Sequence, residues 1–247
     1  MVHRNHVTIQ LGTSLPEREE QAAMFTNANI ATAPVPAGCA RRSLLGMMVI
    51  AAAPLGRRAL AETAASDAIF TIQRFNAALL TAMKSGGQTD FSRRFQALAP
   101  AVDQAFDLSA VLSVSVGPSW ASFSPDQQSQ LLTAFRRYTV ASYVANFDTY
   151  AGQDFTVSPD TRSLGVDRVI VQSRIVKAGG DSTELDYVMK QTSSGWKVVD
   201  VLAGGSISRV AVQRSDFRRI LSNGVDALLA SLRRKASDLS GGALAYG

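Results

Sequence analysis

The spacing of apolar residues changes once along the chain, from a helical period in the first part to a strand period in the second. Apolar side chains first recur every three or four residues, and from about residue 153 they alternate with polar ones. Four amphipathic helices are therefore predicted, over residues 66–84, 89–99, 103–113 and from 124 onward. The last is the clearest, because Ser124, Pro125 and Gln127 form the N-cap, first-turn proline and third-position partner of a capping box.

The alternating part predicts strands joined by short glycine-containing turns. Phe155 and Val157 open the first strand. Later strands are expected at 169–175, 185–189 and 196–201, with hairpin connections at 179–181 and 193–195. In the last strand, strict alternation puts Trp196, Val198 and Asp200 on one face and Lys197, Val199 and Val201 on the other. Gly204 and Gly205 then break it.

Helical periodicity returns after the strands, over 216–221 and again from Val225 to about residue 235. Helices followed by consecutive short-turned strands predict an α+β fold. In this fold the N-terminal helices pack on one face of a C-terminal antiparallel curved sheet, and amphipathic helices close the chain. The expected division is an export segment at 1–61, one domain at 62–237 and a flexible tail at 238–247.

The export segment is predicted from a basic pair and an apolar run. Arg41 and Arg42 precede the run 43–53, which is too short to span a bilayer, and a small-x-small site ends at Ala61. General secretion and twin-arginine export both fit this pattern, and Met24 is a second candidate start. The mature domain is therefore expected to be exported.

Removal of residues 1–61 changes the chemistry that remains. These residues hold six of the 25 Lys and Arg and three of the 20 Asp and Glu, so the net charge falls to about +2, too small to indicate nucleic acid. They also hold both histidines, His3 and His6, and the single cysteine, Cys39. The mature chain therefore has no residue for Ser-His-Asp or Cys-His catalysis, for zinc or haem held by His or Cys, or for a disulfide. No cofactor or metal is predicted.

The ordered series of motifs resembles a known family, the periplasmic lipid carriers of the Mla and toluene-tolerance type (MlaC-like), including the hopanoid-associated members called HpnM. The resemblance covers about residues 66–235. It rests on the segments 106–108, 116–120, 124–128, 185–189, 195–201, 204–208 and 214–217, and on Phe135, Tyr143, Tyr150, Gly224 and Leu228. Gly204-Gly205 departs from the more common Glu-Gly or Asp-Gly pair.

The resemblance implies a protein that holds the acyl chains of a phospholipid, or a hopanoid, between sheet and helices. It also implies partners: an inner-membrane ABC lipid transporter complex and an outer-membrane lipid-handling protein. The residues expected to line the lipid cavity are Phe106, Leu108, Val116, Trp120, Phe135, Tyr143, Phe147, Tyr150, Val171, Tyr187, Met189, Val199 and Val201. For each of these aromatic and aliphatic residues, ordinary core packing is the competing interpretation.

The residues alone leave open two alternative functions that belong to other classes of protein. Asp186 and Asp200 are expected on facing strands, where a carboxylate pair would serve an exported hydrolase. A module that docks on a transporter without holding a ligand fits the same composition. The identity of the lipid and the direction of transport are not encoded in any of these patterns.

Overall fold

The computed structural model describes residues 55–86 and 88–244, with side chains from residue 65 onward. The basic pair, the apolar run, both histidines and the cysteine of the expected export segment lie outside these residues. The expected cleavage point after Ala61 falls within the first described helix, which begins at Leu55 rather than at Ser66.

The sheet is an antiparallel meander in which each strand pairs with the next, in the order β1-β2-β3-β4-β5. Its strands are β1 (Asp154–Ser163), β2 (Arg168–Val176), β3 (Ser182–Thr192), β4 (Gly195–Ala203) and β5 (Ile207–Ser208). The turn between β4 and β5 contains Gly204 and Gly205 with φ of 59° and 72°, values that favour glycine. The predicted meander and its glycine break are confirmed.

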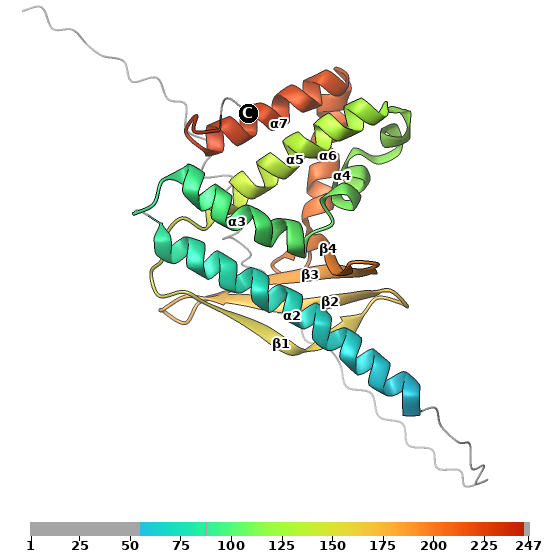
Figure 1. Cartoon of the computed structure of the whole chain (residues 1–247), viewed down its shortest axis with the longest axis vertical. Helices are drawn as coiled ribbons and strands as arrows, with labels where there is room; N and C mark the ends of the chain where they lie inside the picture. Colours follow the sequence, from blue (N-terminus) through green and yellow to red (C-terminus); the bar gives the residue numbers. More distant parts are fainter. Residues whose placement is uncertain (1–54, 87, 245–247) are drawn as a thin grey trace, which may run out of the picture.

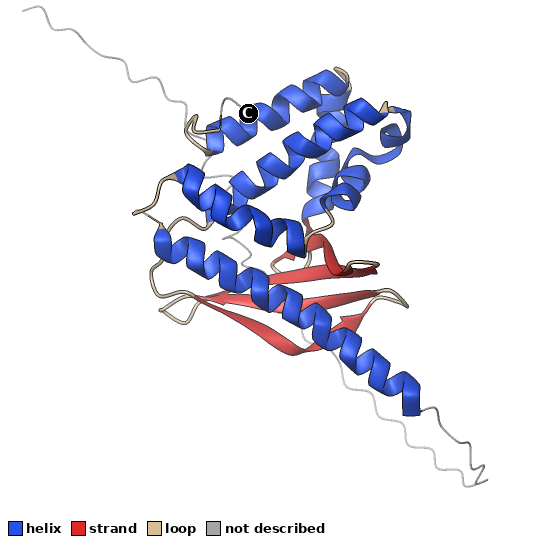
Figure 2. Ribbon diagram, viewed as in Figure 1, coloured by secondary structure: helices blue, strands red, loops and turns tan. Residues whose placement is uncertain are grey.

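Helices form a second layer that covers one face of this sheet. They are α2 (Leu55–Ser85), α3 (Phe91–Ala105), α4 (Leu108–Val116), the 3-10 helix η1 (Gly117–Ser122), α5 (Pro125–Asn146), α6 (Arg209–Leu221) and α7 (Val225–Leu239). In Figure 1, α2 crosses the strands while α3, α5 and α7 lie farther from the sheet. Figure 2 shows the two layers by colour. The predicted α+β class is confirmed.

The helix α3 is longer than the sequence predicts, because Pro100 lies inside it instead of ending it. A proline in a helix leaves the carbonyl four residues earlier without a donor. Pro100 and Gln96 are both exposed, so water can reach that carbonyl. The helix continues past Pro100 to Ala105.

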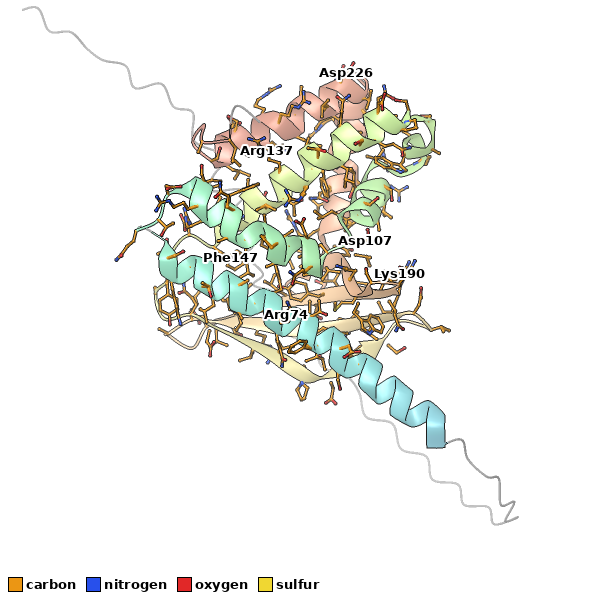
Figure 3. The ribbon with its side chains drawn as sticks, viewed as in Figure 1. Arg74, Asp107, Arg137, Phe147, Lys190 and Asp226 are labelled. Atoms are coloured by element: carbon orange, nitrogen blue, oxygen red, sulfur yellow. The ribbon has the colours of Figure 1, made fainter. Side chains whose placement is uncertain are left out.

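The predicted helix over 103–113 is interrupted at Phe106 and Asp107. The Asp107 side chain accepts a hydrogen bond from Ala110 N at 2.9 Å and caps α4, while its own N–H donates to Val198 O at 3.0 Å. Phe106 forms an isolated parallel bridge with Val198. Figure 3 labels Asp107 at this corner between the helices and the sheet. The break thus ties the start of α4 directly to β4.

Strict alternation along β4 is wrong beyond Val198. The partners of successive β3 residues Val188 and Met189 are Asp200 and Val198, so Val199 is the extra residue of a β-bulge. The bulge shifts the alternation of buried and exposed side chains by one position. Val201 is therefore buried together with Trp196 and Val198, whereas Val199 is half-buried.

The C-terminal helices are also longer than predicted. The helix α6 begins at Arg209, because the Ser208 side chain accepts from Ala211 N at 2.9 Å and caps it. The segment expected as a flexible tail from residue 238 is helical to Leu239. Beyond it Ser240 is buried, and Leu244 O accepts a hydrogen bond from Arg137 Nη2 at 2.6 Å. Residues up to 244 therefore pack against α5.

Candidate functional site

A small cavity lies where α4, α5, α6 and α7 meet the middle of β4. Its volume is about 130 Å³. The residues around it are Phe106, Leu108, Val111, Phe135, Tyr138, Thr139, Ser142, Tyr143, Asn146, Asp200, Val201, Arg209, Val210, Val212, Gln213, Asp216 and Lys235. Its lining is apolar at α4 and at Val201 of β4. Asp200 of β4 and the helices α5, α6 and α7 add charged, hydroxyl and amide groups.

The helix α5 supplies one wall through a single stripe of residues. Phe135, Thr139, Ser142, Tyr143 and Asn146 all line the cavity, and their spacing of three and four places them on one face of the helix. The capping box predicted for this helix is present and fixes where it begins: Gln127 N donates to the Ser124 side chain, and Ser124 N donates to the Gln127 side chain.

Aromatic rings close the cavity on the side of α2. The ring of Phe75 meets those of Phe106 and Tyr143 edge-on, with centroids 5.2 Å apart in both cases. Behind them Tyr187 lies 6.3 Å from Phe75 and is almost fully buried. Phe106 and Tyr143 thus form the surface of the wall, and Phe75 and Tyr187 support it. Edge-to-face packing of this kind gives rings a defined geometry.

Asp200 holds the start of α6 against β4. Its carboxylate accepts hydrogen bonds from Val210 N at 3.0 Å, from Val201 N at 2.8 Å and from the Ser208 hydroxyl. Ser208 is in turn the N-cap of α6. This network sets the position of the helix that contributes the next wall of the cavity.

Two cationic side chains, Arg209 and Lys235, lie on the polar side, and both are half-buried. Lys235 Nζ is 5.8 Å from the centre of the Tyr138 ring, a cation–π contact. Burial raises the pKa of the Tyr143 phenol well above its usual range, and the nearby charge of Arg209 opposes that rise. The phenol therefore stays protonated at neutral pH and is a hydrogen-bond donor beside the cavity.

The structure brings together part of the predicted set of lipid-cavity residues. Five of them line the cavity: Phe106, Leu108, Phe135, Tyr143 and Val201. Three lie in the hydrophobic core between sheet and helices: Val171, Tyr187 and Met189.

The remaining predicted residues lie elsewhere. Val116 borders a second hollow of about 290 Å³ between η1 and α6. Trp120 is half-buried against Phe123, with ring centroids 6.3 Å apart. Phe147 is buried and stacks on Tyr143. Val199 is the bulge residue, and Tyr150 is 43% exposed. None of these five residues borders the first cavity.

Sequence reasoning missed most of the polar lining. The stripe of Thr139, Ser142 and Asn146 was available from its spacing on a helix that the sequence predicted well. Arg209, Val210 and the next turn of α6 carried no such signal, because helical periodicity was recognised only from residue 216.

The two carboxylates of the hydrolase alternative have separate structural partners. Asp186 is nearly buried, and its carboxylate lies 3.0 Å from Arg162 Nη2. Burial raises the pKa of Asp186 above its usual range, and the Arg162 guanidinium opposes part of the rise. The Asp200 carboxylate accepts its hydrogen bonds at the start of α6, as described above. No common site joins the two among the described residues that line either hollow.

Two further features are absent from residues 55–86 and 88–244. These residues contain no group of three or more His, Cys, Asp or Glu side chains arranged to hold a metal ion. Within the same residues, no helix combines the length and the apolarity that a bilayer crossing requires.

Comparison with solved structures identifies the fold. The structure resembles one described as the phospholipid-binding protein from Ralstonia solanacearum in complex with a phospholipid. The TM-score is 0.61 at 20% sequence identity, and the match covers 72% of this chain and 98% of that chain. The family model described as MlaC protein matches residues 73–234. The chain therefore belongs to the MlaC protein family, as its motifs indicated. No curated protein matches it.

Proposed function

We propose that this protein is a lipid carrier that holds the acyl chains of a phospholipid in the cavity between β4 and the helices α4, α5 and α6. The observation that carries the proposal is the cavity itself, lined by Phe106, Leu108, Val111, Phe135 and Val201 in a member of the MlaC family. The related structure from Ralstonia, which holds a phospholipid, supports the choice of ligand.

The size of the cavity requires that it widens when a lipid enters. An engineered protein cavity of about 150 Å³ holds one benzene molecule. This one, at about 130 Å³, accommodates a ligand of similar size. Burial of an acyl chain of about 16 carbons gains on the order of 13 kcal/mol, at roughly 0.8 kcal/mol per methylene. That gain is available to offset the separation of α5 and α6 from the sheet.

The carrier acts in the periplasm after cleavage of the export segment, and shuttles its lipid between an inner-membrane ABC transporter complex and an outer-membrane partner. The predicted signal supports this placement. A hopanoid is the alternative cargo, because flat rings suit a wall of aromatic side chains. No cofactor takes part in holding or releasing a lipid.

A pair of substitutions on α4 tests the proposal. Leu108 lines the cavity and is 8% exposed, whereas Val114 on the same helix is 53% exposed. Wild-type protein and the variants Leu108→Trp and Val114→Trp are incubated with phospholipid vesicles and separated from them. Bound lipid is then extracted and counted per protein molecule. We expect close to one lipid for wild type and Val114→Trp, and far less for folded Leu108→Trp. Equal binding by both variants would place the lipid elsewhere.

The small cavity also favours a second candidate function, a module that docks on a transporter without a ligand. In that case the 130 Å³ space is a packing defect rather than a closed binding site. Wild-type protein would then acquire no lipid from vesicles under any condition, and its partner would bind Leu108→Trp as well as wild type.

A further inference from the structure

The turn between β1 and β2 presents two large apolar side chains to solvent. Leu164 is 49% exposed, and Val166 is fully exposed. The turns after β2 and β3, at 177–181 and 193–194, contain only small, polar or charged residues. That is the usual composition of a hairpin turn. Because an exposed aliphatic side chain adds nothing to the core, this pair has no explanation within the fold.

The tip of this hairpin stands clear of the rest of the molecule. Leu164 N donates to Arg168 O at 2.9 Å and closes the turn. Gly165, between the two aliphatic residues, has a φ of 118°, and a Cβ added to it would meet no atom within 4 Å. The two side chains are therefore presented on a closed turn that no neighbouring element covers.

A row of positive charges crosses the sheet next to this tip. Arg168 lies opposite Lys190, and Lys190 lies opposite Lys197. Figure 3 labels Lys190 at this end of the sheet. Like charges that lie directly opposite each other in a sheet are destabilising. Neither Arg168 nor Lys190 belongs to an ion pair found among the described residues, and Lys197 Nζ donates to two backbone carbonyls of α3.

The nearby carboxylates do not cancel this row. Asp167 lies in the turn itself, and Asp186 is paired with Arg162 at 3.0 Å. Four cations, at positions 162, 168, 190 and 197, against these two carboxylates leave a net charge of +2. The row of Arg168, Lys190 and Lys197, called here the cation row, therefore complements a negatively charged surface.

We infer that this end of the sheet docks on lipid bilayers that contain anionic phospholipids. Leu164 and Val166 enter the boundary between headgroups and acyl chains, and the cation row contacts the lipid phosphates. A bilayer fits both features, because it offers an apolar layer directly beneath a plane of negative charge. An acidic protein surface would meet the cations without giving the aliphatic tip an apolar phase. None of these residues lines the cavity, so the docking surface goes beyond the proposed function.

A fluorescent label at the tip tests the insertion. Cys39 is the single cysteine of the chain, so Val166→Cys in a Cys39→Ser background carries one thiol for a polarity-sensitive fluorophore. Protein from the exported fraction of cells is mixed with vesicles of equal parts phosphatidylglycerol and phosphatidylcholine, or of phosphatidylcholine alone. We expect the emission at position 166 to shift to the blue with both, and more protein to bind the vesicles that contain phosphatidylglycerol. A label at Val114→Cys, on an exposed position of α4, keeps its emission.

Substitutions separate the apolar and the charged contributions to docking, measured by flotation with the vesicles. Val166→Asp lowers the partition coefficient by about tenfold, because an aliphatic side chain no longer leaves water. Lys190→Gln lowers it about fivefold, and only on vesicles that contain phosphatidylglycerol, the effect of one basic residue near an anionic surface.

Two variants provide matched controls for these substitutions. Val114→Asp changes an equally accessible valine on α4. Lys177→Gln removes the same charge from the turn after β2, at the opposite end of the same sheet. Both keep the wild-type partition coefficient. Circular dichroism checks that Val166→Asp folds, as expected for a fully exposed position.

The outcomes separate this surface from the carrier function. An unshifted label at position 166, or flotation of Val166→Asp equal to that of wild type, would overturn the docking inference. A blue shift that grows with protein concentration in the absence of vesicles would assign the tip to contact between two copies of the chain, and would overturn it as well. Extraction of bound lipid tests the cavity separately: a wild type that docks but never acquires lipid keeps the docking surface and loses the carrier function.

Discussion

The hydrogen bond between Asn76 and Ser173 gives a sharp test of how α2 is held on the sheet. Asn76 on α2 is 3% exposed and Ser173 on β2 is 2% exposed, and Asn76 Nδ2 donates to Ser173 Oγ at 3.0 Å. Asn76 Oδ1 is buried without a partner among the described residues. The pair therefore carries one satisfied bond and one uncompensated acceptor.

Ser173→Ala leaves the buried Asn76 amide with no partner at all. A buried polar group that loses its partner costs about 1–3 kcal/mol, whereas replacement of both partners by apolar groups is close to neutral. We expect Ser173→Ala to lower the free energy of unfolding by about 2 kcal/mol and Tm by about 4–8 °C. The double variant Asn76→Leu/Ser173→Ala should recover to within about 1 kcal/mol of wild type.

Urea unfolding followed by circular dichroism measures both variants and their wild-type parent, and the shared slope confirms that the same transition is compared. If the double variant is less stable than Ser173→Ala, the polar pair contributes net stability. The reasoning from the unsatisfied amide would then be refuted.

Three further predictions concern the capping box, the aromatic wall and a buried carboxylate. Ser124→Ala removes the cap of α5 and should lower the free energy of unfolding in urea by about 1 kcal/mol, with Ser119→Ala, at an exposed position of η1, as the control. Phe75→Ala leaves a cavity behind the wall and should cost about 3–5 kcal/mol, and an unchanged urea midpoint would contradict the packing described. Because burial raises the pKa of Asp186, the folded state holds that proton more tightly than the unfolded state, and its contribution to stability falls as pH rises above about 4. The Tm of Asp186→Asn should therefore rise relative to the Tm of wild type as the pH increases from about 4 to 7. A relative fall over that interval would contradict the direction given for the pKa shift of Asp186.

The sequence predicted the elements whose signals are local. The capping box at Ser124 and Gln127 depends on residues within one turn, and the hairpins depend on short glycine turns, so both were found correctly. The alternation along β2 and β3 was found for the same reason. These signals need no knowledge of the rest of the chain.

The errors arose where tertiary contacts override the local pattern. The bulge at Val199 follows Val198, which Phe106 and Asp107 contact from a distant segment, and no pattern within the strand predicts it. The start of α6 depends on Asp200, which belongs to β4. The cavity is lined by β4 next to the bulge and by the first turn of α6. For that reason its apolar wall was partly predicted, and its charged side was not.

The mass of the intact protein tests the central claim most directly. The protein is isolated from the exported fraction of cells and measured by native mass spectrometry, which keeps a noncovalent ligand in place. We predict the mass of the processed polypeptide plus one phospholipid, and the bare polypeptide after organic extraction. The bare polypeptide mass in the freshly isolated protein, unchanged after incubation with vesicles, would contradict the account.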